Sequence, residues 1–332
     1  MSASSESFQA PPPPPVAPRA PRPTKLRPFA IAFFVLGLLI VGGGIAKLIP
    51  GGLQTGGILA LGGIILFAFS FIPLPVIPDE EPPLPFFTKL IGIFIEPSRV
   101  FRNLSVHPHW VGAFAVVVVL TLIYSFAFVQ RITPERIADH MNQKIAEMGP
   151  PFAPPPERLE AMREAQLSQL KNPFERAGTV IKSAVGIFVM GSLTAALCLL
   201  GVLAFGGRIN FWQAISVVFY YWIPITAIQK ILGLAILYLK TPEDLHPILN
   251  QETTLQDNLG ILMSPAVHPV LFVLLSFIGL TWFYLLWLRA KGLHLAGTRV
   301  SSSAAWGVSI MLYVLLMIVV TIWTSLFSGF IS

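Results

Sequence analysis

One apolar stretch of the chain carries the side chains with the most scope for chemistry inside a membrane. It covers residues 206–240 and includes Pro224, Gln229 and Lys230, with Tyr221 shortly before the proline. An ionisable group within a membrane span is a functional-site hypothesis by default, because its charge is costly to bury in hydrocarbon. Pro224 removes a backbone hydrogen bond and is expected to kink the helix, and a kink often lines a cavity. These four residues are the candidate intramembrane site, formed either for function or for packing.

An ion-coupled carrier would need an acidic partner for Lys230. By sequence, each Asp and Glu falls in a tail, a linker or a loop, so the apolar spans contain no carboxylate. Residues 211–240 would form a helix about 45 Å long, well over the roughly 30 Å of hydrocarbon, so Lys230 can extend toward the outer interface or meet a loop acid such as Glu175. We favour a packing role. A small-solute permease or channel with a pathway near Lys230 and Pro224 is the alternative.

The residues typical of enzymes and metal centres do not gather in this sequence. Cys198 is the single cysteine, and the six histidines all lie in loops or at span ends. His107 and His109 are spaced for metal binding, but the sequence His-Pro-His-Trp ahead of an apolar run is better interpreted as a helix start. No HExxH, Walker or GxSxG pattern occurs. We therefore expect no enzyme activity, no catalytic residue, no cofactor and no metal.

The composition places the chain among multi-pass helical membrane proteins. Of its 332 residues, 54% are hydrophobic and only 11% are charged, whereas soluble domains have about 25% charged residues. A β-barrel would show alternating segments of about ten residues, which this sequence lacks. The predicted fold class is therefore all-α, a polytopic bundle of transmembrane helices. The net charge of +6 is scattered over short loops, which argues against nucleic acid and for the lipid bilayer as partner.

Seven apolar segments are long enough to be expected as spans: residues 29–49, 56–72, 111–130, 180–205, 211–240, 269–288 and 304–327. The first two are joined by Pro50-Gly51-Gly52, a turn signal that predicts a transmembrane hairpin over residues 29–77. Residues 1–28 are rich in proline and basic residues and are predicted to be a disordered tail. The other five spans form a membrane domain over residues 86–330.

Two segments are expected at the membrane surface. Residues 86–105 repeat apolar side chains at helical spacing, and Pro97 divides them into two short helices. Their polar face, with Lys89, Arg99 and Arg102, is predicted to contact lipid headgroups. Residues 131–177 form a long loop that should hold two short amphipathic helices separated by a proline-rich break.

The charge distribution predicts the orientation. With the N-terminus in the cytoplasm, the cytoplasmic segments hold the basic residues of the tail followed by Lys89, Arg99, Arg102, Arg208, Arg289, Lys291 and Arg299. The outside segments then hold the charge-balanced long loop and the acidic segment that follows Lys240. This arrangement satisfies the positive-inside rule, places the C-terminus outside and fits a cell (inner) membrane.

Several short motifs recur in order from Phe86 onward. They are Ile95-Glu96-Pro97-Ser98-Arg99-Val100-Phe101, Phe211-Trp212-Gln213-Ala214 at the start of the span containing Pro224, Thr241-Pro242-Glu243-Asp244-Leu245, Asn258-Leu259-Gly260 and His268-Pro269. In these motifs the chain resembles the bacterial branch of the Yip family, the Ypt/Rab-interacting multi-pass membrane proteins. The resemblance implies a five-span domain with a cytoplasmic N-terminus. It also favours a non-enzymatic scaffold that organises the membrane or binds a partner, either another membrane protein or a second copy of the chain.

Overall fold

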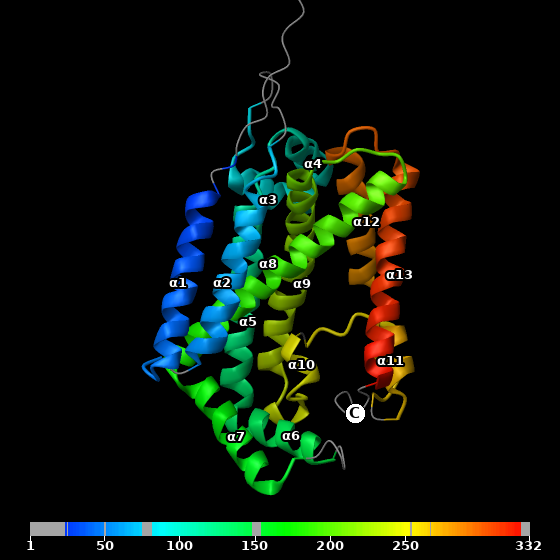
Figure 1. The fold of residues 1–332 in the computed structure, drawn as a ribbon. Helices are drawn as coiled ribbons and strands as arrows, with labels where there is room; N and C mark the ends of the chain where they lie inside the picture. Colours follow the sequence, from blue (N-terminus) through cyan, green and yellow to red (C-terminus); the bar gives the residue numbers. More distant parts are fainter. Residues whose placement is uncertain are drawn as a thin grey trace, which may run out of the picture.

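The computed structural model describes residues 24–326 except 25, 50, 75–81, 148–153, 253 and 266. Most of the predicted tail, the centre of the linker after the hairpin and part of the proline-rich break in the long loop lie outside the described residues. The helices, in chain order, are α1 (Arg27–Ile45), α2 (Gly52–Phe69), α3 (Phe86–Ile95), α4 (Pro97–Val106), α5 (Val111–Ile132), α6 (Pro134–Glu147), α7 (Pro156–Lys171), α8 (Pro173–Ala204), α9 (Phe211–Leu239), η1 (Pro242–Asp244), α10 (Leu249–Glu252), η2 (Leu259–Leu262), α11 (Pro269–Ser276), α12 (Leu280–Ala296) and α13 (Ser302–Leu326). The described chain forms no strand, and the predicted all-α bundle is confirmed (Figure 1).

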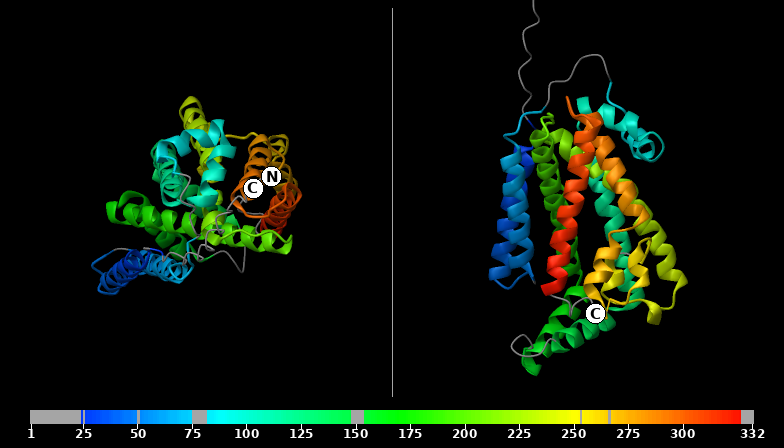
Figure 2. Two further views of the ribbon diagram at one scale, coloured as in Figure 1. Left: turned by 90° about the horizontal axis from the view of Figure 1, so that it is seen from above. Right: turned by 90° about the vertical axis from the view of Figure 1, so that its right-hand side faces the viewer.

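Six helices of the described chain are long and apolar enough to cross a membrane: α1, α2, α5, α8, α9 and α13. The seventh expected span, over residues 269–288, is corrected by the structure, which divides it into α11 and α12. Both halves pack along α13. Seen from above, α8 crosses the bundle between the α1–α2 hairpin and the other helices (Figure 2).

The break between α11 and α12 is stabilised by backbone pairing with a distant loop. Leu259 N–H donates to the Ile278 carbonyl at 2.9 Å, and the Tyr313 hydroxyl donates to the Phe277 carbonyl at 2.6 Å. A Cβ at Gly279 would lie 2.8 Å from the Cβ of Asn258, so the loop approaches this closely only because residue 279 is glycine. Tyr313 lies near the middle of α13, which places the break at mid-depth of the bundle.

Helix α9 is the central element of the core. Asn210 and Gln213 form a capping box at its start, and the Gln213 amide also donates to the Ser105 carbonyl at 2.6 Å, which fixes α9 to the end of α4. Lower down, the buried Phe219 ring stacks on Trp110 and meets Phe114 edge-on, with centroids 5.8 and 5.3 Å apart. Aromatic packing of this kind joins α9 to α5.

The α1–α2 hairpin is held by direct contact between helix backbones. A Cβ at Gly56 would lie 2.6 Å from the Gly37 carbonyl oxygen and 2.6 Å from Val41 N, and Gly63 is equally close to Phe34 N. Small residues allow such close approach, which is how helices associate without a hydrophobic driving force in lipid. A methyl group at Gly57, on the other face of α2, would meet no atom within 4 Å.

This difference between neighbouring glycines gives a matched pair of substitutions. Gly56→Ala should force the helices apart and destabilise the protein by about 1–3 kcal/mol, the usual cost of overpacking. Gly57→Ala should be neutral or slightly stabilising, because alanine is the better helix former by about 1 kcal/mol. Thermal unfolding of both variants in the same mild detergent measures the difference. Equal unfolding temperatures for the two would contradict the backbone contact.

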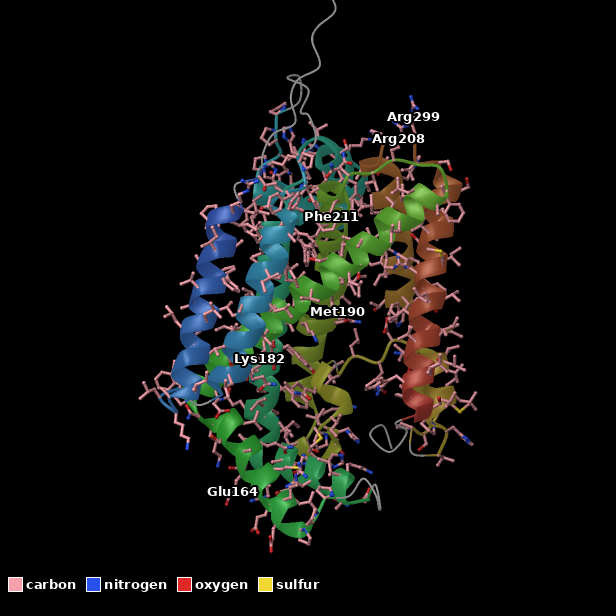
Figure 3. The ribbon with its side chains drawn as sticks, in the orientation of Figure 1. Glu164, Lys182, Met190, Arg208, Phe211 and Arg299 are labelled. Atoms are coloured by element: carbon pink, nitrogen blue, oxygen red, sulfur yellow. The ribbon has the colours of Figure 1, made fainter. Side chains whose placement is uncertain are left out.

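The two ends of the bundle differ in charge. We call the end that carries α3, α4 and the loops before α9 and α13 the basic end; its charged residues include Arg99, Arg102, Arg208, Lys291 and Arg299. Figure 3 shows Arg208 and Arg299 at this end and Glu164 of α7 at the opposite end. There α6 and α7 pair through Arg163–Asp139 and Lys171–Glu135 ion pairs. Two short helices divided at Pro97, and two more in the long loop, agree with the sequence prediction; their place at a lipid surface stays a prediction.

His246, at the end opposite the basic one, has a pH-dependent role that can be tested. Its Nδ1 accepts a hydrogen bond from Ile248 N–H at 3.1 Å, so the ring is neutral in this fold. Burial, helped by nearby His140, Lys144 and Arg136, lowers the pKa of His246 below its usual 6.5. The unfolded chain therefore binds more protons, and stability should fall as the pH drops from about 6.5 through the lowered pKa.

We expect the protection of the Ile248 amide, measured against the intrinsic exchange rate at the same pH, and the melting temperature to fall as the pH is lowered from about 7.5 to about 5.5. His246→Asn should remove much of this pH dependence, because an asparagine oxygen can accept the same bond without titrating. An unchanged pH profile in His246→Asn would assign the dependence to another group.

Candidate functional site

Lys230 lies inside the bundle, 7% exposed, and its ammonium group sits 4.7 Å from the centre of the Tyr124 ring on α5. Close to it, the Tyr124 hydroxyl donates to the Asn250 carbonyl at 2.6 Å, and Thr254 Oγ1 donates to the Gly233 carbonyl at 2.6 Å. Lys230 is thus enclosed between α5, α9 and the segment around α10. A cation held against an aromatic face is stabilised by the ring quadrupole.

The acid suggested for Lys230 from the sequence lies elsewhere. Glu175, at the start of α8, stands beside the turn at Gly51 and 3.5 Å from the Ser168 hydroxyl. It therefore belongs to the contact between the hairpin and α7–α8, and the suggested pairing with Lys230 is wrong. The sequence could not show this, because the tilt of α8 decides which helix its first turn meets.

The other residues of the predicted intramembrane site occupy two different levels of α9. Pro224 is buried, Gln229 is half-buried, and α9 continues without interruption through the proline. Tyr221 is 1% exposed and lies in the core of the bundle. Nine residues separate Tyr221 from Lys230, about 13 Å along the helix, so the structure does not bring these two side chains together.

Arg289 is a buried residue that the sequence assigned to a cytoplasmic segment. The structure corrects this: α12 continues to Ala296, and Arg289 is 6% exposed within the bundle. Its Nη2 donates to the Ser309 carbonyl of α13 at 2.5 Å, while its Nε is buried without a partner among the described residues. The apolar residues after it, such as Leu293, are the signal that the helix continues.

Asp257, which the sequence placed in a segment outside the spans, lies half-buried beside the break between α11 and α12. The loop before η2 folds back into the bundle, and Asp257 Oδ2 accepts hydrogen bonds from Thr281 N–H, at 2.7 Å, and from the Thr281 hydroxyl. The carboxylate therefore caps the N-terminus of α12 at the mid-depth break, where a negative charge is favoured by the helix dipole. No ion pair joins Asp257 to Lys230 in the described chain.

The cap can be tested with two substitutions at one position. Asp257→Ala leaves the Thr281 N–H and hydroxyl without their acceptor and should destabilise the protein by about 0.5–2 kcal/mol. Asp257→Asn keeps an acceptor oxygen and should cost less. Thermal unfolding in detergent, with hydrogen exchange at the first turn of α12, reports both effects. Equal stability of the alanine and asparagine variants would exclude a capping role.

The three predicted headgroup residues separate in the structure. Arg99 and Arg102 are exposed at the basic end, as their predicted role requires, but Lys89 is 2% exposed and points inward. Helix α3 instead exposes Phe87 and Ile95. Burial lowers the pKa of Lys89 to about 8. The prediction assumed a helix beside water, whereas a helix at a lipid surface can turn its apolar side chains outward and its cation toward the protein.

Lys89 lines a cavity of about 700 Å³ at the basic end, together with Phe86, His109, Trp110 and Tyr220. Among the described residues, no carboxylate lines this cavity, and the Lys89 ammonium group forms no hydrogen bond or ion pair with them. Desolvation and the nearby Lys89 charge lower the pKa of His109. The described charge nearest this cavity is therefore the cation of Lys89.

A second hollow of about 720 Å³ lies beside the first on the basic end. Its charged lining residues are Glu96, Arg99, Arg102 and Lys291. Arg99 is 3.6 Å from Glu96, and the Lys291 ammonium lies 4.6 Å from the centre of the Trp287 ring. The Arg99–Glu96 pair is exposed, so its interaction is weak in water.

The described residues hold no group of three or more His, Cys, Asp or Glu side chains arranged for a metal ion. His107 and His109 stack with ring centres 6.2 Å apart, and His140 meets His246 edge-on. The histidine rings therefore meet in pairs outside the spans. The charged residues inside the bundle include Lys230, Arg289 and Asp257.

The fold and these positions define a multi-pass helical membrane protein with a basic end and buried charges used between helices. The Yip1 domain model matches residues 91–324, which is more than half of the chain. The protein belongs to the Yip1 domain family. No curated protein and no solved structure matches the chain. The family predicted from the sequence is confirmed, while the bacterial branch stays a prediction.

Proposed function

We propose that this protein is a non-enzymatic scaffold that organises the membrane or binds a protein partner. The observation that supports it most is the use of the charges inside the bundle. Lys230 lies against an aromatic ring, Arg289 binds a backbone carbonyl of α13, and Asp257 caps α12. Lys230 and Arg289 therefore join helices to one another, and Asp257 joins a loop to a helix, which are packing roles.

Two surfaces suit a scaffold. Within the protein, only 11% of the apolar window of α1 and 22% of that of α13 is buried. These flanks face lipid, a second membrane protein or another copy of the chain. The exposed arginines of the basic end suit anionic headgroups. The same charge bias supports a cytoplasmic N-terminus and an inner-membrane location.

A permease is the second candidate, and one observation favours it. Helices broken at mid-depth, with irregular backbone beside them, form the substrate sites of many transporters. The α11–α12 break with Asp257 is such an element, and it adds to the pathway near Lys230 and Pro224 that the sequence suggested.

Reconstitution into liposomes separates the two candidates. Flux of ions and small solutes is measured for the wild type, Lys230→Ala and Asp257→Asn, with empty liposomes as the baseline. A scaffold gives baseline flux in all of them, because the buried charges act in packing. Flux that exceeds the baseline and disappears in Lys230→Ala would overturn the scaffold.

A positive test uses photo-crosslinking in native membranes. Wild type is compared with a double variant, Arg99→Gln and Arg102→Gln, and with Arg176→Gln on α8 as a control at the opposite end. If the basic end recruits the scaffold's partner, defined adducts should weaken in the double variant and persist in the control. Adducts that are unchanged in the double variant would exclude the basic end as the binding surface.

A further inference from the structure

The Lys89 cavity adjoins a second cavity between helices that are long and apolar enough to cross a membrane. This second cavity, of about 570 Å³, is formed between the α1–α2 hairpin and helices α5 and α8. The two cavities share the lining residues Leu26, Phe29, Trp110 and Val111. The two cavities are therefore neighbours, and together they offer a charged end at Lys89 and an apolar end between the helices.

The apolar end has the form that an acyl chain needs. Its lining comes from α1, α2, α5 and α8 and is apolar throughout. From Leu66 to Leu59 on α2 the lining descends seven residues, about 10 Å along the helix. Phe29 and Phe33 are 62% and 42% exposed on its rim, so the space is open to the surrounding lipid.

The charged end holds the Lys89 cation, which has no counter-charge among the described residues. Lys89 is almost fully buried, and no ion pair of the described chain neutralises it. His109 and Tyr220 line the same space and can add hydrogen bonds. The Trp212 indole N–H, also in the lining, is already donated to the Ile72 carbonyl at 3.0 Å. A buried cation of this kind is costly unless an anion neutralises it.

We propose that this space binds one anionic phospholipid from the bilayer, with its phosphate on Lys89 and an acyl chain between the hairpin and helices α5 and α8. Charge complementarity selects an anionic headgroup, and the adjoining apolar cavity selects a lipid over a free anion. The proposal does not depend on the scaffold, because a permease can hold the same lipid. Failure of one therefore leaves the other unaffected.

The test measures lipid binding to the full-length protein in detergent by native mass spectrometry. Phosphatidylglycerol and phosphatidylcholine with identical chains are titrated, so that only the headgroup charge differs. We expect phosphatidylglycerol to bind about tenfold more tightly, the size of one charge-assisted hydrogen bond. Lys89→Met should abolish this preference, whereas Lys89→Arg should keep it. Lys291→Met removes the same charge from the other hollow of the basic end and should also keep it.

Two further measurements test where the acyl chain binds and whether free phosphate can replace the lipid. Ala184→Leu fills part of the apolar cavity and should weaken binding of both lipids while the headgroup preference remains. Inorganic phosphate at equal concentration should not displace phosphatidylglycerol. Thermal unfolding without added lipid verifies that each variant folds. The proposal is overturned by equal binding of the two lipids to the wild type, by a preference that survives Lys89→Met, by unchanged binding in Ala184→Leu, or by displacement with phosphate alone.

Discussion

In a hydrocarbon layer each backbone N–H and C=O must find its partner within the protein, and this constraint shapes the whole bundle. Continuous helices such as α5 and α9 satisfy it internally. The interrupted pair α11–α12 cannot, so the chain returns a loop into the bundle to supply what is missing. From this loop Leu259 pairs with Ile278 and Asp257 with Thr281, while Tyr313 of α13 binds the Phe277 carbonyl. The loop is therefore as much a part of the membrane domain as the helices.

Charged side chains inside the bundle must also find partners within the protein. Lys230 has an aromatic face, Arg289 a backbone carbonyl and Asp257 the first turn of a helix. Neither the carbonyl that Arg289 binds nor the helix turn that Asp257 caps can be recognised in the sequence as the complement of a charge. A search for opposite charges within spans therefore underestimates how well a membrane protein accommodates ionisable groups.

The sequence predicted what depends on local pattern. Apolar length located α1, α2, α5, α8, α9 and α13, and Pro97 located the division between α3 and α4. The break at residues 277–279 was missed because Gly279 alone does not break a helix; the distant Asn258 makes the difference. The inward direction of Lys89 was missed because helical spacing gives the two faces of α3 but not which one the protein covers. A local sequence pattern shows neither which distant segments pair nor how a helix is rotated about its axis.

The hairpin precedes the matched Yip1 region in the chain, yet its end is fastened to that region. Trp212 donates its indole N–H to Ile72, and Asn210 donates to Pro73 at 3.4 Å. Hairpin and domain also enclose one cavity between them. The start of the matched region in the sequence is therefore not a boundary between separate structural units, because residues on both sides of it line the same cavity. Without the hairpin, the domain would lose the acceptor of the Trp212 indole N–H and one wall of this cavity. The hairpin therefore completes the structure of the domain that follows it.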